Sequence, residues 1–175
     1  MHSAGLRRAL VGLSAALAAL FVIGVFTVPA SASEHRQIVA TGSWTDPGAV
    51  IDSATPTGKG YILKMHGGTT TVGDFAGTST YTLTARANLS TGVTIARSRE
   101  IFTAVLGTRG TGHVTFDETV VVRADGTEVV TGTIVTGDGV FTGAHGSDRF
   151  VGTTDPRGAN PATGTYRIVF SLASE

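Results

Sequence analysis

Residues Arg99–Val122 read REIFTAVLGTRGTGHVTFDETVVV, two runs of alternating apolar residues on either side of the glycine-rich segment Gly107–Gly112. Alternation with a period of two is typical of β-strands, and glycines between two such runs favour a hairpin turn. Glu100 shares a face with apolar residues of the first run, and Glu118 does so in the second. The stretch therefore predicts a β-hairpin with one carboxyl group on the apolar face of each strand.

The register of this hairpin decides whether the two glutamates meet. If Leu106 pairs with Gly112, Glu100 lies directly opposite Glu118, with Cβ atoms about 4.5–5.5 Å apart. Two such carboxyls cannot both ionise cheaply, so one pKa should rise and the pair should titrate as a unit. The alternative is a structural role, in which Glu100 pairs with an arginine and Glu118 marks a bulge or an edge facing water. A slip of one residue would also turn one carboxyl outward.

The first 32 residues have the features of a signal peptide. Arg7 and Arg8 precede a long apolar stretch, which ends in the small residues before Ala32. This order is typical of a secretory signal, and we predict cleavage after Ala32. The apolar stretch is also about long enough to span a bilayer, so an uncleaved anchor is the alternative. The cleaved product would be secreted, or held at the cell wall, with no further membrane attachment.

The remaining segment, 33–175, is large enough for one domain with its own core. It has no cysteine, so its stability must come from packing and strand pairing. This segment holds all 13 acidic residues and 11 of the 13 basic residues of the chain, so its formal charge is close to neutral. Scattered charges of this kind argue against a nucleic-acid-binding protein. Threonine, valine and glycine are abundant and helical windows are few, so the segment reads as all-β.

Turn signals divide the domain into about eight strands. Proline- and glycine-rich segments at 45–58 and 153–163 are expected to be long loops. Antiparallel strands of this number form either a sandwich or a barrel, and closure removes exposed edges. We therefore predict a single antiparallel closed β-barrel, calycin-like in architecture, with room for one small ligand. The expected strands are 37–44, 61–66, 74–89, the two runs of the central hairpin, 128–135, a short strand with Phe150, and 166–172.

Other candidate site residues follow from this alternation. Arg97 and Arg99 alternate with Glu100 and should face solvent. Three histidines, His66, His113 and His145, lack the spacing of metal ligands, so no metal and no cofactor is predicted. Alanines expected to face inward, among them Ala104, are small and therefore favour a cavity inside the barrel. Its apolar lining is predicted to include five aromatic residues: Trp44, Tyr61, Phe102, Phe116 and Tyr166.

Two groups of residues resemble a known family. Glu100, Leu106, Gly107, Arg109 and Gly112 form the first group; Gly137, Gly139, Phe141, Gly143 and Gly146 form the second. Their order resembles the allene-oxide-cyclase-like barrels, in particular a bacterial branch of uncharacterised secreted proteins. The related dirigent proteins share the pattern G-x-F-x-G-A-x-G found at 139–146. The resemblance covers most of 33–175. Glu118 stands where the bacterial branch often has a histidine.

The resemblance implies an eight-stranded barrel with a cavity for an apolar small molecule. Members with a known role steer a reactive intermediate into one cyclic or coupled product, and relatives often associate into homo-oligomers. Three functions remain open on the sequence. The barrel could guide a cyclisation or isomerisation with Glu100 and Glu118 as catalytic groups, it could bind a ligand without catalysis, or it could be a filled structural barrel. Fold analogy alone does not choose among them.

Overall fold

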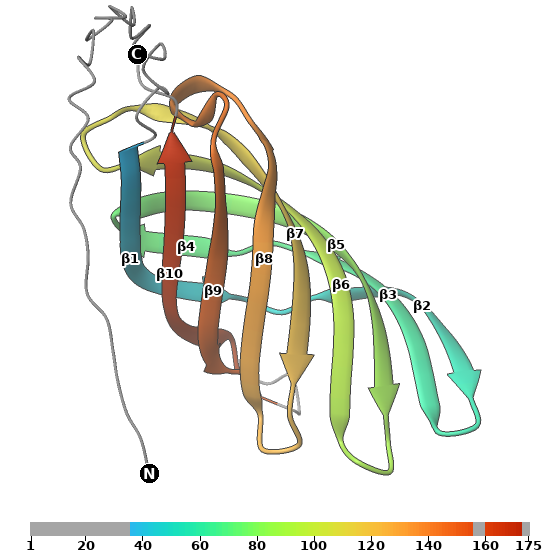
Figure 1. Ribbon diagram of the computed structural model, residues 1–175. Helices are drawn as coiled ribbons and strands as arrows, with labels where there is room; N and C mark the ends of the chain where they lie inside the picture. The colour runs from blue at the N-terminus through green and yellow to red at the C-terminus, as the bar shows by residue number, and fades with distance from the viewer. Residues whose placement is uncertain (1–35, 156–159, 173–175) are drawn as a thin grey trace, which may run out of the picture. The chain divides into compact units, whose positions relative to one another are not determined.

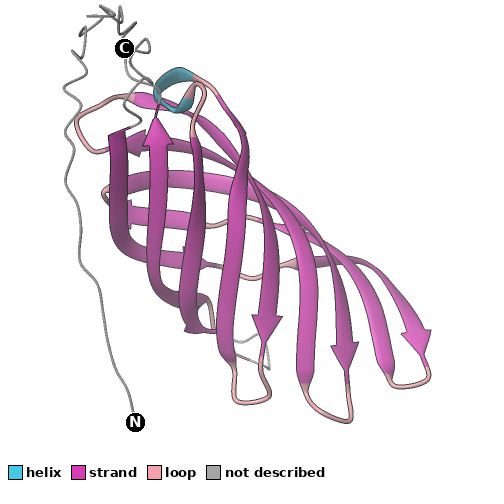
Figure 2. Ribbon diagram, in the orientation of Figure 1, coloured by secondary structure: helices cyan, strands magenta, loops and turns pink. Residues whose placement is uncertain are grey.

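The computed structural model describes residues 36–155 and 160–172, which form an all-β domain (Figures 1 and 2). The predicted signal peptide, 1–32, lies outside the described residues. Among the residues that are described, no helix is long and apolar enough to cross a membrane. The elements of the described part are β1 (Arg36–Asp46), β2 (Val50–Thr57), β3 (Gly60–Gly67), β4 (Thr70–Gly73), β5 (Phe75–Asn88), β6 (Val93–Leu106), β7 (Thr111–Val122), β8 (Thr127–Gly137), the 3₁₀ turn η1 (Gly139–Phe141), β9 (His145–Thr153) and β10 (Ala162–Leu172).

The strands close into a barrel, as predicted. In the described part the order is β2-β3-β5-β4-β1-β10-β9-β8-β7-β6, and β6 pairs again with β5. That last pairing closes a ring by joining β6, at one end of the order, to β5 over the full length of both strands, from Phe75 opposite Leu106 to Asn88 opposite Val93. The strands β1 and β4–β10 therefore form the ring, while β2 and β3 lie outside it (Figure 1).

The outer hairpin is an extension of two barrel strands. β3 and β4 pair with β5 in one continuous register, interrupted only at Gly68 and Thr69. Gly68 lies against the carbonyl of Ser79, where a Cβ would collide with backbone. Beyond this close approach β3 pairs with β5, and β2 pairs with β3. The outer hairpin therefore extends beside β5 and β6 and away from β10 (Figure 1).

One loop prediction was wrong. Segment 45–58 was expected to be a loop, but Val50–Thr57 forms β2. All eight residues of β2 are exposed, and its only partner among the described strands is β3. Proline is tolerated in such an edge strand, because its missing N–H leaves no ladder bond unmade. Pro56 therefore lies within β2, opposite Tyr61.

Phenylalanine rings fill one end of the barrel. Phe75 lies at the centre, 5.2 Å from Phe102, 5.7 Å from Phe141 and 5.8 Å from Phe170 between ring centroids. All four side chains are fully buried. Phe141 reaches this position because η1 folds its short segment across the end of the barrel rather than extending the sheet. Aromatic clusters of this size dominate core stability, so this end of the barrel is packed core.

Candidate functional site

Glu100 and Glu118 lie on the inner face, but the predicted register was wrong by two residues. Ala104, not Leu106, pairs with Gly112, so Glu100 lies opposite Phe116 and Glu118 lies opposite Ser98. The two glutamates are therefore diagonal neighbours across β6 and β7. A shift of two residues keeps every side chain on its face. Both glutamates are accordingly buried, Glu100 being 6% exposed and Glu118 3%.

A small cavity lies between the phenylalanine core and the mouth of the barrel. Its volume is about 60 Å³, room for the polar head of a ligand or a few waters rather than a drug-sized molecule. Four of its twelve lining residues are acidic, and none is basic. The lining residues are Trp44, Asp46, Thr69, Tyr81, Leu83, Ser98, Glu100, Glu118, Val120, Glu128, Val130 and Phe150.

Glu100 is held in place by hydroxyl groups. The Ser79 hydroxyl donates a short hydrogen bond to Oε1 of Glu100. The Ser79 oxygen in turn accepts from the Thr69 backbone N–H at 2.8 Å, across the interruption between β3 and β4. Burial raises the pKa of Glu100, and the hydrogen bonds from Ser79 and Thr69 oppose that rise in part. Glu100 is thus a fixed, buried carboxyl whose charged form has donors of its own.

Glu118 lies between two other carboxyls, Glu100 and Asp148. Asp148 comes from β9 and faces Gly132 of β8, as Glu118 does from β7. A Cβ on Gly132 would lie 2.6 Å from Cγ of Glu118 and 2.9 Å from Oδ2 of Asp148. The absence of a side chain at Gly132 therefore allows these two acids to approach each other. Three carboxyls, from β6, β7 and β9, form one row.

The row requires a proton or another donor. As carboxylates the three groups would face acceptor to acceptor, and Oε1 of Glu118 and both oxygens of Asp148 would have no donor. With a proton on Glu118, that carboxyl can donate one hydrogen bond, to Glu100 or to Asp148. Burial, followed by the charges of Glu100 and Asp148, raises the pKa of Glu118 well above its ordinary value. Glu118 is therefore an acid of the row whose surroundings strongly favour its protonated form.

Burial affects the neighbouring ionisable groups in the same direction. It raises the pKa of Asp148 to about 7, and the charge of Glu100 adds to this rise. Burial, with the charges of Asp46 and Glu100, raises the pKa of Glu128 to about 7. Tyr81 donates a 2.6 Å hydrogen bond to Oδ2 of Asp46, and burial together with this bond raises its pKa. The cavity thus concentrates acids that favour their protonated forms.

The aromatic residues predicted as ligand-binding occupy different places. Trp44 lines the cavity. Phe102 and Phe116 are fully buried in the core, with ring centroids 5.9 Å apart, and are not among the lining residues. Tyr166 is also buried, and its hydroxyl accepts from the N–H of Phe75 and donates to the carbonyl of the same residue. Tyr61 is 41% exposed on β3, outside the ring. A role for these residues in ligand binding stays a prediction.

Several residues of the site were missed from the sequence. Asp148 alternates with Phe150 in a strand that was predicted, and this pattern could have marked it as inward-facing. Glu128 comes two residues after the turn at Asp125–Gly126, and in the sequence it resembles a solvent-exposed strand end. Asp46 and Ser79 give no such signal, because their place depends on contacts between distant strands.

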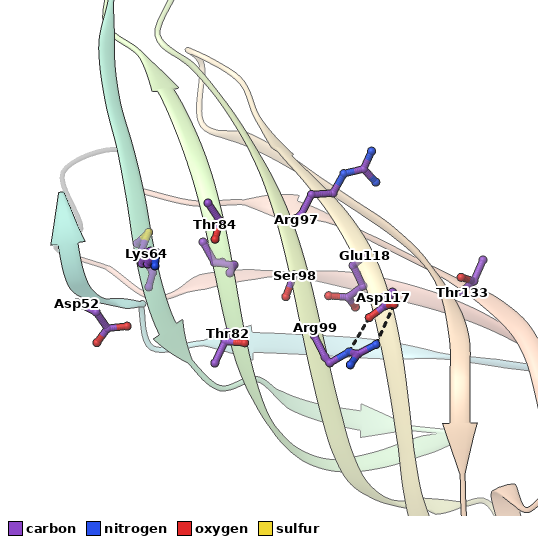
Figure 3. Close-up of a pocket in the computed structure, with 12 residues that line it drawn as sticks. Asp52, Lys64, Thr82, Thr84, Arg97, Ser98, Arg99, Asp117, Glu118 and Thr133 are labelled. Atoms are coloured by element: carbon purple, nitrogen blue, oxygen red, sulfur yellow. Dashed lines mark hydrogen bonds and ion pairs between the residues drawn. The ribbon is translucent and has the colours of Figure 1, made fainter. Parts of the chain in front are cut away.

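The opposite face of the same strands is charged and exposed. Arg99 and Asp117 form a two-point ion pair with N–O distances of 2.8 and 3.1 Å, one residue away from Ser98 and Glu118 (Figure 3). They border an open hollow of about 830 Å³, whose other acidic and basic lining residues are Asp52, Lys64, Arg97 and Glu118. The prediction that Arg97 and Arg99 face away from Glu100 is confirmed. His66 and His113 make surface pairs with Asp52 and Asp138.

Comparison with known proteins identifies the fold. No protein-family model and no curated protein matches this chain. The pterocarpan synthase dirigent protein PsPTS1 superposes with a TM-score of 0.56 at 15% identity, over 80% of this chain and 97% of that one. The fold is that of the dirigent proteins. A second pterocarpan synthase dirigent protein, GePTS1, matches with a TM-score of 0.55 at 14% identity, over 89% of this chain and all of that one.

The dirigent part of the predicted resemblance is therefore confirmed at the level of the fold. Both solved structures are covered almost completely, so the chain spans the whole of this barrel fold. The narrower placement, in a bacterial branch of allene-oxide-cyclase-like proteins, stays a prediction. At identities of 14–15% the likeness says nothing about which residues act.

Proposed function

We propose that this dirigent-like barrel binds an apolar, reactive small molecule and guides its cyclisation or isomerisation. The observation that carries the proposal is the row of three buried carboxyls beside a cavity with apolar and aromatic walls. Groups of this kind can donate and accept protons near neutral pH, which is where general acid–base catalysis is most effective. Two of the solved structures with this fold are titled pterocarpan synthase dirigent proteins, which supports a synthetic role for a barrel of this kind.

The chemistry assigned to the cavity is a proton relay. Glu118 donates its proton to an oxygen of the substrate, such as an epoxide or carbonyl oxygen, and thereby weakens the adjacent bond. Glu100, ionised and fixed by Ser79, stabilises the positive charge that develops and accepts the proton that the rearranged product releases. A proton transfer between the two carboxyls restores the starting state. No atom is gained or lost, so the product is an isomer of the substrate.

The cavity determines which part of the substrate enters. About 60 Å³ accommodates the reacting group but not a whole lipid or polyketide. The half-buried residues Asp46, Leu83, Val120 and Glu128 surround the more deeply buried ones and form the mouth. The remainder of the substrate would lie across this mouth, so the shape of the mouth would select the folded conformation that reacts.

We expect Glu100→Gln to reduce turnover at least about 100-fold, because loss of one acid–base group typically costs 10²- to 10⁴-fold. The assay offers reactive epoxides and polyketides to the purified domain and follows isomeric products by chiral chromatography. Asp117→Asn is the matched control, since Asp117 lies on the outer face of the neighbouring strand. Full activity in Glu100→Gln would contradict the proposal. Ligand binding without turnover in the unmodified protein would leave the carrier function that the sequence also allowed.

The proposal places this activity outside the cell. Three further proposals rest on the sequence alone. They are export with cleavage after Ala32, release from the cell or attachment to the wall, and association into homo-oligomers. N-terminal sequencing of the exported protein tests the first of these, with Ser33 as the expected first residue and Met1 as the contradicting one.

A further inference from the structure

The charges that face the cavity are all of one sign. Asp46, Glu100, Glu118 and Glu128 line it from four different strands, and Asp148 adjoins Glu118 from a fifth. No lysine, arginine or histidine is among the lining residues. Buried carboxyls without a partner are costly, and proteins normally pair them. A positively charged ligand would offset the free-energy cost of burying these carboxyls.

Hydrogen-bonding capacity points to the same kind of ligand. Oε1 of Glu118 has no donor, and the residue is 97% buried where it lines the cavity. Both oxygens of Asp148, the next carboxyl in the row, also lack a donor. The site therefore has acceptors in excess. A substituted ammonium group supplies up to three N–H donors and no acceptor, which complements this arrangement.

The walls of the cavity favour an organic cation over a metal ion. Trp44, Tyr81 and Phe150 line it, and aromatic faces attract ammonium groups through their π electrons. No group of acidic or histidine side chains among the described residues is arranged to hold a metal. The volume of about 60 Å³ is that of a head group, and Leu83 and Val120 at the mouth offer contact to an apolar body.

We infer that the cavity binds the ammonium group of an otherwise apolar amine, which donates hydrogen bonds to Glu118 and replaces the proton that the row of carboxyls otherwise requires. This inference rests on the proposed function only in using the same cavity, and it does not need turnover. It identifies apolar amines as ligands that would compete with the proposed neutral substrate for the cavity. Because the ligand takes the place of a bound proton, binding should release protons to the buffer.

The test is calorimetric titration of the exported protein at pH 7 with three probes of similar size: phenethylamine, 2-phenylethanol and 3-phenylpropanoate. We expect the amine to bind at least about tenfold more tightly than the alcohol, and the acid to bind more weakly than either. Repeating the amine titration in two buffers of different ionisation enthalpy should reveal proton release. Glu118→Gln should weaken amine binding about tenfold or more, whereas Asp117→Asn should not change it.

Three results would overturn the inference. They are an amine that binds no more tightly than the alcohol, an unchanged amine affinity in a folded Glu118→Gln protein, and displacement of the amine by micromolar calcium, which would indicate a metal site. Glu128→Gln, at the more exposed mouth, serves as the second variant if Glu118→Gln does not fold. The proposed function is judged separately, because turnover of neutral epoxides in the chiral assay does not depend on any of these outcomes.

Discussion

Raising the pH from 5 to 8 is expected to lower the free energy of unfolding by at least about 4 kcal/mol, although most domains change little in this range. The cause is a set of four buried acids with raised pKa values. Glu100, Glu118 and Glu128 line the cavity together with Asp46 and Tyr81, and Asp148 adjoins Glu118. An acid whose pKa is raised on folding stabilises the folded state while it is protonated. That contribution is complete below its unfolded pKa and is lost as the pH rises through its folded pKa.

The pH window follows from the individual groups. The pKa of Asp148 rises from 3.8 to about 7, and that of Glu128 from 4.5 to about 7. Such a shift costs about 2–3 kcal/mol per group between pH 5 and pH 8. Urea unfolding at the two pH values measures the difference. The double variant Glu118→Gln with Asp148→Asn should flatten the dependence and be the more stable protein at pH 8. Equal or greater stability of the unmodified protein at pH 8 would contradict the expectation.

Phe102→Ala is expected to destabilise the barrel by about 3–5 kcal/mol, the usual cost of removing a fully buried phenyl ring. The ring of Phe102 lies within 5.2 Å of Phe75, 5.9 Å of Phe116 and 6.2 Å of Phe150, measured between centroids. These neighbours come from three different strands, so the space cannot close without moving the sheet. Because Phe150 lines the polar cavity, the vacated space should deepen it and admit larger ligands.

Ile101 provides the matched control for this variant. It is the adjacent residue of β6, faces outward and is 45% exposed. Ile101→Ala should therefore cost less than about 1.5 kcal/mol in the same chemical denaturation experiment. If Phe102→Ala costs no more than Ile101→Ala, the interior at this level is not packed, and the assignment of this end of the barrel as filled core is wrong.

The sequence predicted the barrel because its inward and outward residues alternate with little interruption. Along β6, Glu100, Phe102 and Ala104 are buried while their neighbours are exposed, as the period of two requires. The same alternation placed Glu118 on the inner face. Threonine-rich outer positions and glycine turns completed the prediction of an all-β domain.

The alternation could not predict the register of the central hairpin, because the register depends on the conformation of the turn. Leu106 closes the turn on Gly110, with its N–H donating to the Gly110 carbonyl at 3.0 Å. Positive φ values of 53° at Gly107 and 124° at Gly110 allow this short connection. The sequence shows several glycines there without showing which of them adopt such angles. A longer turn was assumed, and the partner of Glu100 was displaced by two residues.

The partners of the glutamates were also beyond prediction, because they come from distant strands. Asp148 reaches Glu118 only after β8 and β9 have paired in one specific register, with Gly132 between the two acids. Ser79 reaches Glu100 because β5 pairs with β6. Pairings of this kind determine which groups share a cavity, and local periodicity does not contain them.

The measurement that tests the central claim most directly is a carboxyl-carbon NMR titration of Glu100, Glu118 and Asp148 in the purified protein. We expect the resonance of Glu118 to titrate well above the ordinary glutamate pKa of about 4.3, together with a raised pKa for Asp148. In Asp148→Asn the pKa of Glu118 should fall toward its ordinary value, because one of the two charges that raise it is gone. Three independent titrations near the ordinary values would contradict the claim that these carboxyls share a proton in one buried row.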